Sequence, residues 1–130
     1  MRVRQTLPKS NILRGYQSFT SVITNGVSFK GALLSVFMLK EAGKKKLTVG
    51  FSVPKKRVAL AVNRNRIRRL MREAVRKNFA EAQATATEKN TGADIVVIFK
   101  GDKSIDIARL KLQDVEPEWI TIQEQIIQML

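Results

Sequence analysis

The strongest constraint on the fold is a stretch from Val62 to about Ala84 in which apolar residues recur with the period of an α-helix. The apolar positions are spaced i, i+3, i+4, i+7 and i+8, so they share one face of such a helix. They are Ile67, Leu70, Met71, Ala74 and Val75. The sequence therefore predicts one long helix whose apolar face packs into a core formed with the other elements.

The opposite face of this predicted helix carries almost only positive charge. At about 100° per residue, the side chains that point away from the apolar stripe are mostly basic. They are Asn65, Arg68, Arg69, Arg72 and Arg76, and the stripe is flanked by Arg64, Arg66 and Lys77. Ordinary solvated faces mix charges of both signs, whereas residues 54–77 hold ten basic side chains and a single acid, Glu73. We therefore favour a face that binds a polyanion over a plain solvated face.

The net charge of the chain supports this interpretation. The 130 residues carry 24 Lys and Arg against 11 Asp and Glu, a formal charge of +13. The excess lies early in the chain, because residues 1–77 hold 19 basic and 2 acidic side chains. Positive side chains at this density repel one another in the folded state unless an anionic partner neutralises them. Arginine predominates in the basic segment, and its planar guanidinium suits phosphate oxygens.

The residue types that are missing exclude several kinds of site. With no histidine and no cysteine, the chain cannot form a Ser-His-Asp or Cys-His catalytic group, a Cys/His zinc site or a disulfide. Carboxylates remain as candidates, but Glu116 and Glu118 flank Pro117 and fit the start of a helix, where the dipole favours negative charge. We predict no catalytic residue and no metal ligand in this chain.

The length and the hydrophobic content indicate a single domain over residues 1–130. A chain of this length is typical of one domain, and 44% hydrophobic residues are enough to build a core. The basic N-terminus has no apolar run behind it, and no apolar stretch approaches the ~20 residues that cross a bilayer. The absence of cysteine permits a cytosolic location, and we expect a cytoplasmic protein.

Shorter patterns predict two further helices. Helical spacing indicates a first helix over Leu13–Gly26 and a last helix from about Pro117 to Met129. The last helix is expected to turn four side chains inward: Trp119, Ile122, Ile126 and Met129. A polar loop is predicted over Thr85–Gly92, after the long basic helix.

The strands are predicted from apolar runs. Phe29–Lys40 and Leu47–Val53 are expected to form an antiparallel hairpin, which Pro54 ends because proline cannot donate to a strand ladder. Ala93–Phe99 is continuously apolar, as expected of a buried strand. The order is then helix, two or three strands, helix, strand, helix.

Two smaller features are open to more than one interpretation. Tyr16, Phe19 and Phe37 are candidates to stack on unpaired bases, although their spacing alone favours core packing. The run Pro54-Lys55-Lys56-Arg57-Val58 is similar to a nuclear import signal, a match that often arises by chance. Because it lies between a strand and the basic helix, we assign it to the same binding surface.

The basic segment also has a more specific pattern. Lys55-Lys56 is followed by Ala61-Val62-Asn63-Arg64-Asn65-Arg66-Ile67-Arg68-Arg69-Leu70-Met71-Arg72-Glu73, and this run resembles the signature of the bacterial ribonuclease P protein subunit. Further similarity lies in the N-terminal basic segment, the first helix and the strands: Leu7-Pro8-Lys9, Arg14, Phe19, Val22, Gly26, Gly50-Phe51-Ser52-Val53 and Asp94-Ile95-Val96-Val97-Ile98. Two positions depart from the family. Thr48 stands where an arginine is common, and Ile23 where a second aromatic is frequent.

The resemblance implies a particular fold. The family has an α+β fold, a two-layer α/β sandwich like the second domain of ribosomal protein S5. Its elements follow the order α-β-β-β-α-β-α, and an unusual left-handed strand–helix–strand crossover surrounds the basic helix. Residues 7–100 carry the resemblance, whereas residues 101–116 do not match clearly.

The resemblance also implies a function, as a subunit of the ribonuclease P ribonucleoprotein. In this family the catalyst is an RNA with Mg²⁺ at its active site, and the protein assists endonucleolytic removal of the 5′ leader from precursor tRNA. The partners would be the ribonuclease P RNA and precursor tRNA, with the Mg²⁺ bound mainly by RNA, no membrane and no small-molecule substrate. The isolated chain would not be catalytic.

By position, the family's binding residues fall into two groups in this sequence. The group expected to bind RNA comprises Lys55, Lys56, Arg64, Asn65, Arg66, Arg68, Arg69, Arg72 and Arg76. Within it, the residues from Arg64 to Arg72 are expected at the RNA subunit or beside the cleavage site, and Lys55 and Lys56 near the leader cleft. The group expected to line the cleft for the single-stranded leader comprises Phe19, Phe37 and Arg14. The resemblance therefore favours a binding role for Phe19 and Phe37 over core packing alone.

Three other functions are weighed against this one. A ribosomal-protein-like RNA-binding module without a processing role would show the same basic surface. A DNA-binding regulator would place the basic helix in a major groove, but the sequence lacks helix-turn-helix spacing. A protein-only nuclease would need catalytic carboxylates, for which we find no pattern.

Overall fold

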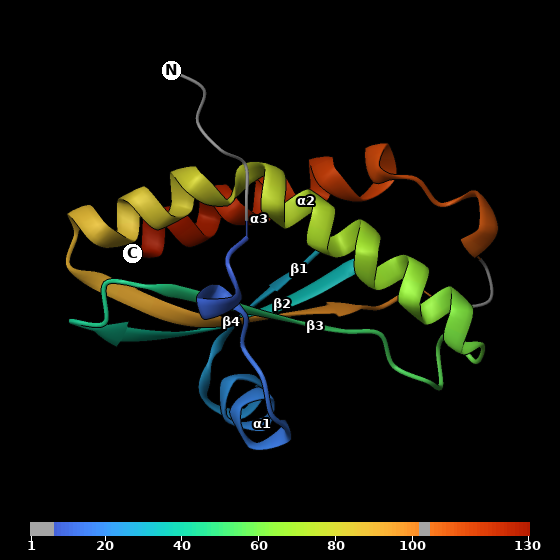
Figure 1. Ribbon diagram of the computed structural model, residues 1–130, viewed down its shortest axis with the longest axis horizontal. Helices are drawn as coiled ribbons and strands as arrows, with labels where there is room; N and C mark the ends of the chain where they lie inside the picture. Colours follow the sequence, from blue (N-terminus) through green and yellow to red (C-terminus); the bar gives the residue numbers. More distant parts are fainter. Residues whose placement is uncertain (1–6, 102–104) are drawn as a thin grey trace.

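Figure 1 shows the fold as a computed structural model, which describes residues 7–101 and 105–130. The order of helices and strands is the expected one and the predicted α+β class is confirmed, but helices cover both faces of the sheet, so the layers are three and not the two that were predicted. In chain order the elements are the 3-10 turn η1 (Lys9–Asn11), α1 (Tyr16–Asn25), β1 (Val27–Lys30), β2 (Leu34–Ala42), β3 (Leu47–Ser52), α2 (Ala61–Glu88), β4 (Thr91–Phe99), the 3-10 turn η2 (Ile107–Arg109) and α3 (Leu112–Met129). None of these helices is both long and apolar enough to span a membrane.

The strands form a 4-stranded sheet in the order β1-β2-β4-β3. The predicted hairpin between Phe29–Lys40 and Leu47–Val53 was wrong, because β4 lies between β2 and β3. β4 occupies the centre because it is apolar on both faces, and Ile95, Val96 and Val97 are at most 2% exposed. β4 is parallel to β3 and joined to it through α2. The left-handed crossover of this unit stays a prediction.

The first apolar run is divided into two strands, β1 and β2, which form the antiparallel hairpin of the sheet. The chain turns at Gly31, where a Cβ atom would lie 2.7 Å from Cγ of Glu118. The Glu118 carboxylate accepts hydrogen bonds from the backbone N–H groups of Leu33 (2.9 Å) and Leu34 (2.8 Å). The partner that fixes this turn lies in α3, 85 residues beyond Leu33, so no local pattern reveals it.

The helices cover both faces of the sheet (Figure 1). α2 and α3 pack against each other and against one face, where the main core lies. The predicted apolar stripe of α2 is confirmed, since Ile67, Met71, Ala74 and Val75 are at most 1% exposed and Leu70 is half-buried. α1 lies on the other face, in contact with β2 and β4.

The ends of the two long helices differ from the prediction. α2 continues to Glu88, so the polar loop over Thr85–Gly92 was wrong. The buried side chains of Ala82 and Ala86 continue the inward stripe with small residues, whose hydrophobic signal in the sequence is weak. The hydroxyl of Thr85 donates to the carbonyl of Glu81 (3.1 Å), which satisfies that polar group within the helix.

α3 begins at Leu112, and Pro117 lies inside it rather than at its start. The first turn is capped by Asp114, whose carboxylate accepts a hydrogen bond from the backbone N–H of Lys111 (2.9 Å). The inward positions Trp119, Ile122 and Ile126 are confirmed. Met129 was predicted to face inward but is 40% exposed at the helix end.

Candidate nucleic-acid interface

The predicted basic residues gather at the N-terminal half of α2 and in the loop that precedes it. Lys55 and Lys56 lie exposed in a turn after β3. Asn65, Arg69 and Arg72 are exposed on α2, whereas four further arginines are half-buried: Arg64, Arg66, Arg68 and Arg76. This end of α2 extends beyond the sheet in Figure 1. The structure therefore collects these side chains into one region, although they do not all have the same environment.

Two of the half-buried arginines fix backbone segments around α2. Arg64 donates to the carbonyls of Val58 (3.0 Å) and Ala59 (2.6 Å), which holds the loop before the helix. Arg66 donates to the carbonyls of Ile107 (2.6 Å) and Leu110, which ties the segment before α3 to α2. Carbonyl oxygens do not neutralise a guanidinium, so both side chains keep their positive charge while acquiring a fixed position.

Arg76 lies in a different electrostatic environment. It forms an ion pair with Glu73, in which Nε donates to Oε2 at 2.9 Å and Nη2 donates to Oε1. The hydrogen bond from Arg76 is the main cause that lowers the pKa of Glu73, and the charge of Lys77 adds to it. Lys77 itself lies 3.8 Å from Glu116. The positive charge of α2 is therefore partly compensated from this turn onward.

The centre of the surface is formed by the half-buried Arg68 and the exposed Arg69 and Arg72, which we call the arginine face. Within residues 7–101 and 105–130, none of them forms an ion pair with a carboxylate. Arg68 donates to Oδ1 of Asn65 (2.8 Å), and the Arg72 guanidinium lies 5.9 Å from the centroid of the Phe51 ring. Uncompensated arginines on one helix face are the arrangement that binds phosphate groups.

A second group of predicted residues lies on the opposite face of the sheet, beside α1. Gly50, Val96 and Phe37 pair across three adjacent strands and so form one row, which we call the aromatic row together with Phe19. Phe19 of α1 packs its ring on Gly50, where a Cβ atom would lie 2.6 Å from Cε1 of that ring. Phe37 and Phe19 are both half-buried. The structure thus brings the two predicted aromatics to the same row of the sheet.

The next row toward the end of β3 was not predicted from sequence. Ser52, Ile98 and Ser35 pair across the same three strands and are all half-buried. Beyond Ser52 the chain leads through Pro54 to the exposed Lys55 and Lys56. The serines could have been found only from the true strand order, because the wrongly predicted hairpin pairs them with other residues.

Arg14 lies at the beginning of α1, at the edge of this second region. The predicted helix over Leu13–Gly26 starts three residues later than expected, at Tyr16. Leu13 is instead held along β3 by a hydrogen bond from its N–H to the carbonyl of Val49 (3.0 Å). Gly15 then turns the chain with φ 98°, a conformation that favours glycine. Arg14 is exposed at this turn.

The two carboxylates that flank Pro117 have structural partners. Glu118 was predicted to sit at a helix start, but it holds the β1–β2 turn. Glu116 accepts a hydrogen bond from Asn78 (3.0 Å). In residues 7–101 and 105–130, no three acidic side chains come together in a group that could hold a metal ion.

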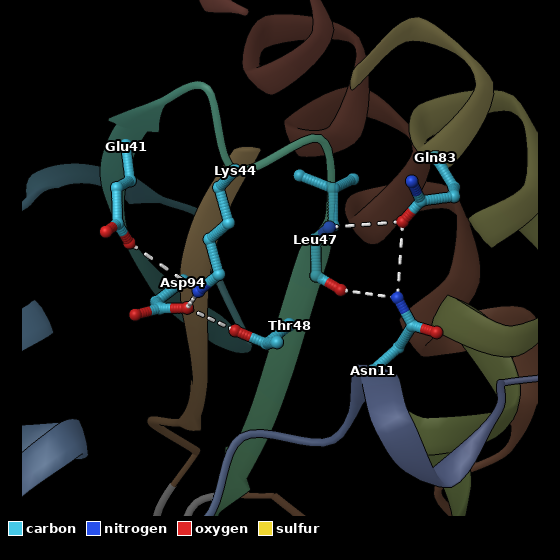
Figure 2. Close-up of polar contacts among 7 residues, drawn as sticks. All are labelled: Asn11, Glu41, Lys44, Leu47, Thr48, Gln83 and Asp94. Atoms are coloured by element: carbon cyan, nitrogen blue, oxygen red, sulfur yellow. Dashed lines mark hydrogen bonds and ion pairs between the residues drawn. The ribbon is translucent and has the colours of Figure 1, made fainter. Parts of the chain in front are cut away.

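Thr48, one of the two departures from the family pattern, lies beside a local ion pair (Figure 2). Thr48 is 8% exposed, and its hydroxyl donates to the carboxylate of Asp94. Lys44, from the turn between β2 and β3, supplies the cation for the same carboxylate and lies 3.7 Å from Glu41. Thr48 thus joins a polar cluster of its own on this part of the sheet.

The amino-acid sequence is similar to known proteins of one family. A family model described as Ribonuclease P matches residues 7–121. The ribonuclease P protein component of Chlorobium phaeobacteroides is 42% identical over 76 residues, which cover 55% of this chain and 52% of that protein. The same component of Clostridioides difficile is 38% identical over 86 residues, covering 66% and 68%. The match thus spans about half the length of the Chlorobium relative.

Solved structures share the fold. The ribonuclease P protein from Thermotoga maritima superposes with a TM-score of 0.69 and 24% identity, covering 88% of this chain and 96% of that one. The Staphylococcus aureus ribonuclease P protein superposes with a TM-score of 0.66 and 19% identity, covering 91% and 96%. Because the family model matches most of the sequence and the fold agrees, the chain belongs to the ribonuclease P protein family.

Proposed function

We propose that this chain is the protein subunit of a ribonuclease P ribonucleoprotein, which binds a catalytic RNA and the 5′ leader of precursor tRNA. The observation that carries the proposal is the arginine face, since Arg69 and Arg72 are exposed, Arg68 is half-buried, and no described carboxylate forms an ion pair with any of the three. Phosphates that replace counterions on such a face give a binding affinity that falls steeply with salt concentration.

The aromatic row supplies the second part of the proposal. Phe19 and Phe37 are half-buried on one sheet face, so part of each ring is accessible to an unpaired base. The hydroxyls of Ser52 and Ser35 follow in the next row, and Lys55 and Lys56 come after the end of β3. A single-stranded RNA segment could stack its bases on the aromatic rings and place its backbone against the hydroxyl groups and the lysines. We infer that this segment is the leader.

In this proposal the bond-breaking groups belong to the RNA. The chain has no histidine or cysteine, and its described carboxylates form no group for a metal ion. Mg²⁺ at the cleavage site would be held mainly by RNA phosphates. The protein's own contribution is to neutralise phosphates with the arginine face and to hold the leader against the sheet. Such a role would place the protein in the cytoplasm, where tRNA precursors of bacteria are processed.

Reconstitution tests the proposal. The full chain is mixed with a bacterial ribonuclease P RNA and precursor tRNA at low Mg²⁺, and cleavage at the 5′ end is followed over time. We expect faster cleavage than with the RNA alone, and no cleavage by the chain alone. Cleavage no faster than with the RNA alone would instead favour a ribosomal-protein-like RNA-binding module. Metal-dependent cleavage by the isolated chain would favour a protein nuclease.

A further inference from the structure

The segment that leads into α1 wraps around the free edge of β3. Residues 9–15, which we call the N-terminal strap, start on the sheet face that carries α2 and end on the face that carries α1 (Figure 1). Ile12 forms a parallel bridge with Val49, and the N–H of Leu13 bonds to the carbonyl of Val49 at 3.0 Å. The strap therefore links the position of α1 to the opposite side of the sheet.

One polar side chain holds the start of the strap. Asn11 is 8% exposed, and its Nδ2 donates to the carbonyl of Leu47 (2.7 Å) and to Oε1 of Gln83 (3.2 Å). The same Oε1 accepts a hydrogen bond from the N–H of Leu47 (3.1 Å), so three residues from the strap, β3 and α2 form a closed network (Figure 2). Nε2 of Gln83 donates to the carbonyl of Lys45 (3.2 Å), which fixes the amide orientation of that side chain.

The other end of the strap carries residues of the proposed leader site. Arg14 directly follows Leu13, and one turn of α1 later Phe19 lies on Gly50. The C-terminal end of α1 is held separately, because the chain passes through Gly26 into β1 and the sheet. Loss of the Asn11 bonds would therefore loosen the first half of α1, with Arg14 and Phe19, more than its second half, although the bonds from Ile12 and Leu13 to Val49 remain.

We infer that Asn11, together with Gln83, is a positioning residue for leader binding: from the far side of the sheet, it sets the place of Arg14 and Phe19. The part of the inference that concerns leader binding rests on the proposed function. Its structural part, the control of α1 by Asn11, can be measured on the protein alone. A buried donor that meets two acceptors is also hard to replace, since few side chains match both.

The test uses Asn11→Asp, which keeps the side-chain shape and replaces the donor by an acceptor. In hydrogen exchange on the full chain, we expect faster exchange at the amides of Leu13 and Phe19 and unchanged exchange at the end of α1. In the reconstituted complex, KM for precursor tRNA with a long leader should rise at least about fivefold, the low end for one lost base–aromatic stack. KM for a substrate without a leader, kcat and the affinity for the ribonuclease P RNA should not change.

Two further variants control the result. Gln83→Ala breaks the same network from α2 and should reproduce both effects, even if the first variant folds poorly. Glu118→Ala removes comparable backbone hydrogen bonds at the β1–β2 turn and should not affect leader binding selectively. Unchanged exchange at Leu13 in both network variants would overturn the inference, and so would an equal rise in KM for leaderless substrate. If the unaltered protein showed no leader dependence, the proposed function would fail, while the exchange data would still decide the role of Asn11.

Discussion

Gly50 is the residue on which the aromatic row most directly depends, and Gly50→Ala tests that row. A Cβ atom at this position would lie 2.6 Å from Cε1 of Phe19 and 3.2 Å from the carbonyl oxygen of Leu13. Carbon atoms in favourable contact are about 3.5–4.0 Å apart, so the ring has to move by roughly 1 Å. The carbonyl oxygen of Leu13 is also closer to the added carbon than an ordinary contact, so the backbone crowds the new methyl group as well.

The energy follows from two opposing effects. Overpacking of a well-packed site destabilises by about 1–3 kcal/mol. Replacing a strand glycine by alanine recovers about 0.5–1 kcal/mol, because the unfolded chain loses conformational freedom. We therefore expect Gly50→Ala to lower the free energy of unfolding by about 1–2 kcal/mol, measured by urea denaturation, and to weaken binding of precursor tRNA with a leader.

A double-mutant cycle separates this cause from a general strand effect. In the Phe19→Ala background the ring is absent, so Gly50→Ala should be neutral or slightly stabilising. The coupling energy between the two positions should then be about 1 kcal/mol or more. Equal destabilisation by Gly50→Ala in both backgrounds would show that the contact with Phe19 is not the cause. An unchanged stability together with unchanged leader affinity would refute the role of Gly50 in this row.

The other predictions concern charge and the distant turn. Arg68→Ala should lower RNA affinity and reduce the slope of log K against log salt by about 1, and an unchanged slope would mean that this side chain contacts no phosphate. Glu73→Gln should have the opposite effect on that slope, because it releases Arg76 from its carboxylate partner. The lowered pKa of Glu73 arises mainly from the Arg76 hydrogen bond, so the pair stabilises the fold above the ordinary value of 4.5 and this contribution is lost as the pH falls through the lowered pKa. The stability of the Glu73→Gln variant should therefore change less than that of the unaltered protein between pH 6 and pH 3, as followed by thermal unfolding, and parallel curves would contradict this. Glu118→Ala leaves the N–H groups of Leu33 and Leu34 without their acceptor and should destabilise by about 1–3 kcal/mol in urea denaturation, whereas a loss below a few tenths would show that water replaces the carboxylate.

The sequence predicted those features that depend on local periodicity. The stripe from Ile67 to Val75 identified the buried face of α2 because one helix turn repeats the same environment. The same period placed Arg68, Arg69 and Arg72 on the exposed side. The helical period could not show which arginines already have hydrogen-bond partners. Arg66, for example, donates to the carbonyls of Ile107 and Leu110, which lie in a distant segment.

The errors arose where long-range contacts decide the structure. Leu47–Val53 has the pattern of a hairpin strand, but β4 takes the place beside it because its apolar residues need burial on both faces. Asn11 has no pattern at all in the sequence, and its role depends on Leu47 and Gln83, which are 36 and 72 residues away. A single sequence without strand order cannot reveal such partners.

β3 lies between the two proposed binding regions, and its two faces and its outer edge each contact a different part of the protein. Leu47 and Val49 point into the core below α2, whereas Gly50 faces α1 and admits the Phe19 ring. The outer edge of the strand receives the N-terminal strap, and its end leads to Lys55 before α2 begins. A change in the position of β3 would therefore move the arginine face and the aromatic row together. β3 is thus one of the elements that link the two regions, together with β4 and α3 on which α2 also packs, and a protein that binds a folded RNA and a single-stranded leader at the same time needs such a link.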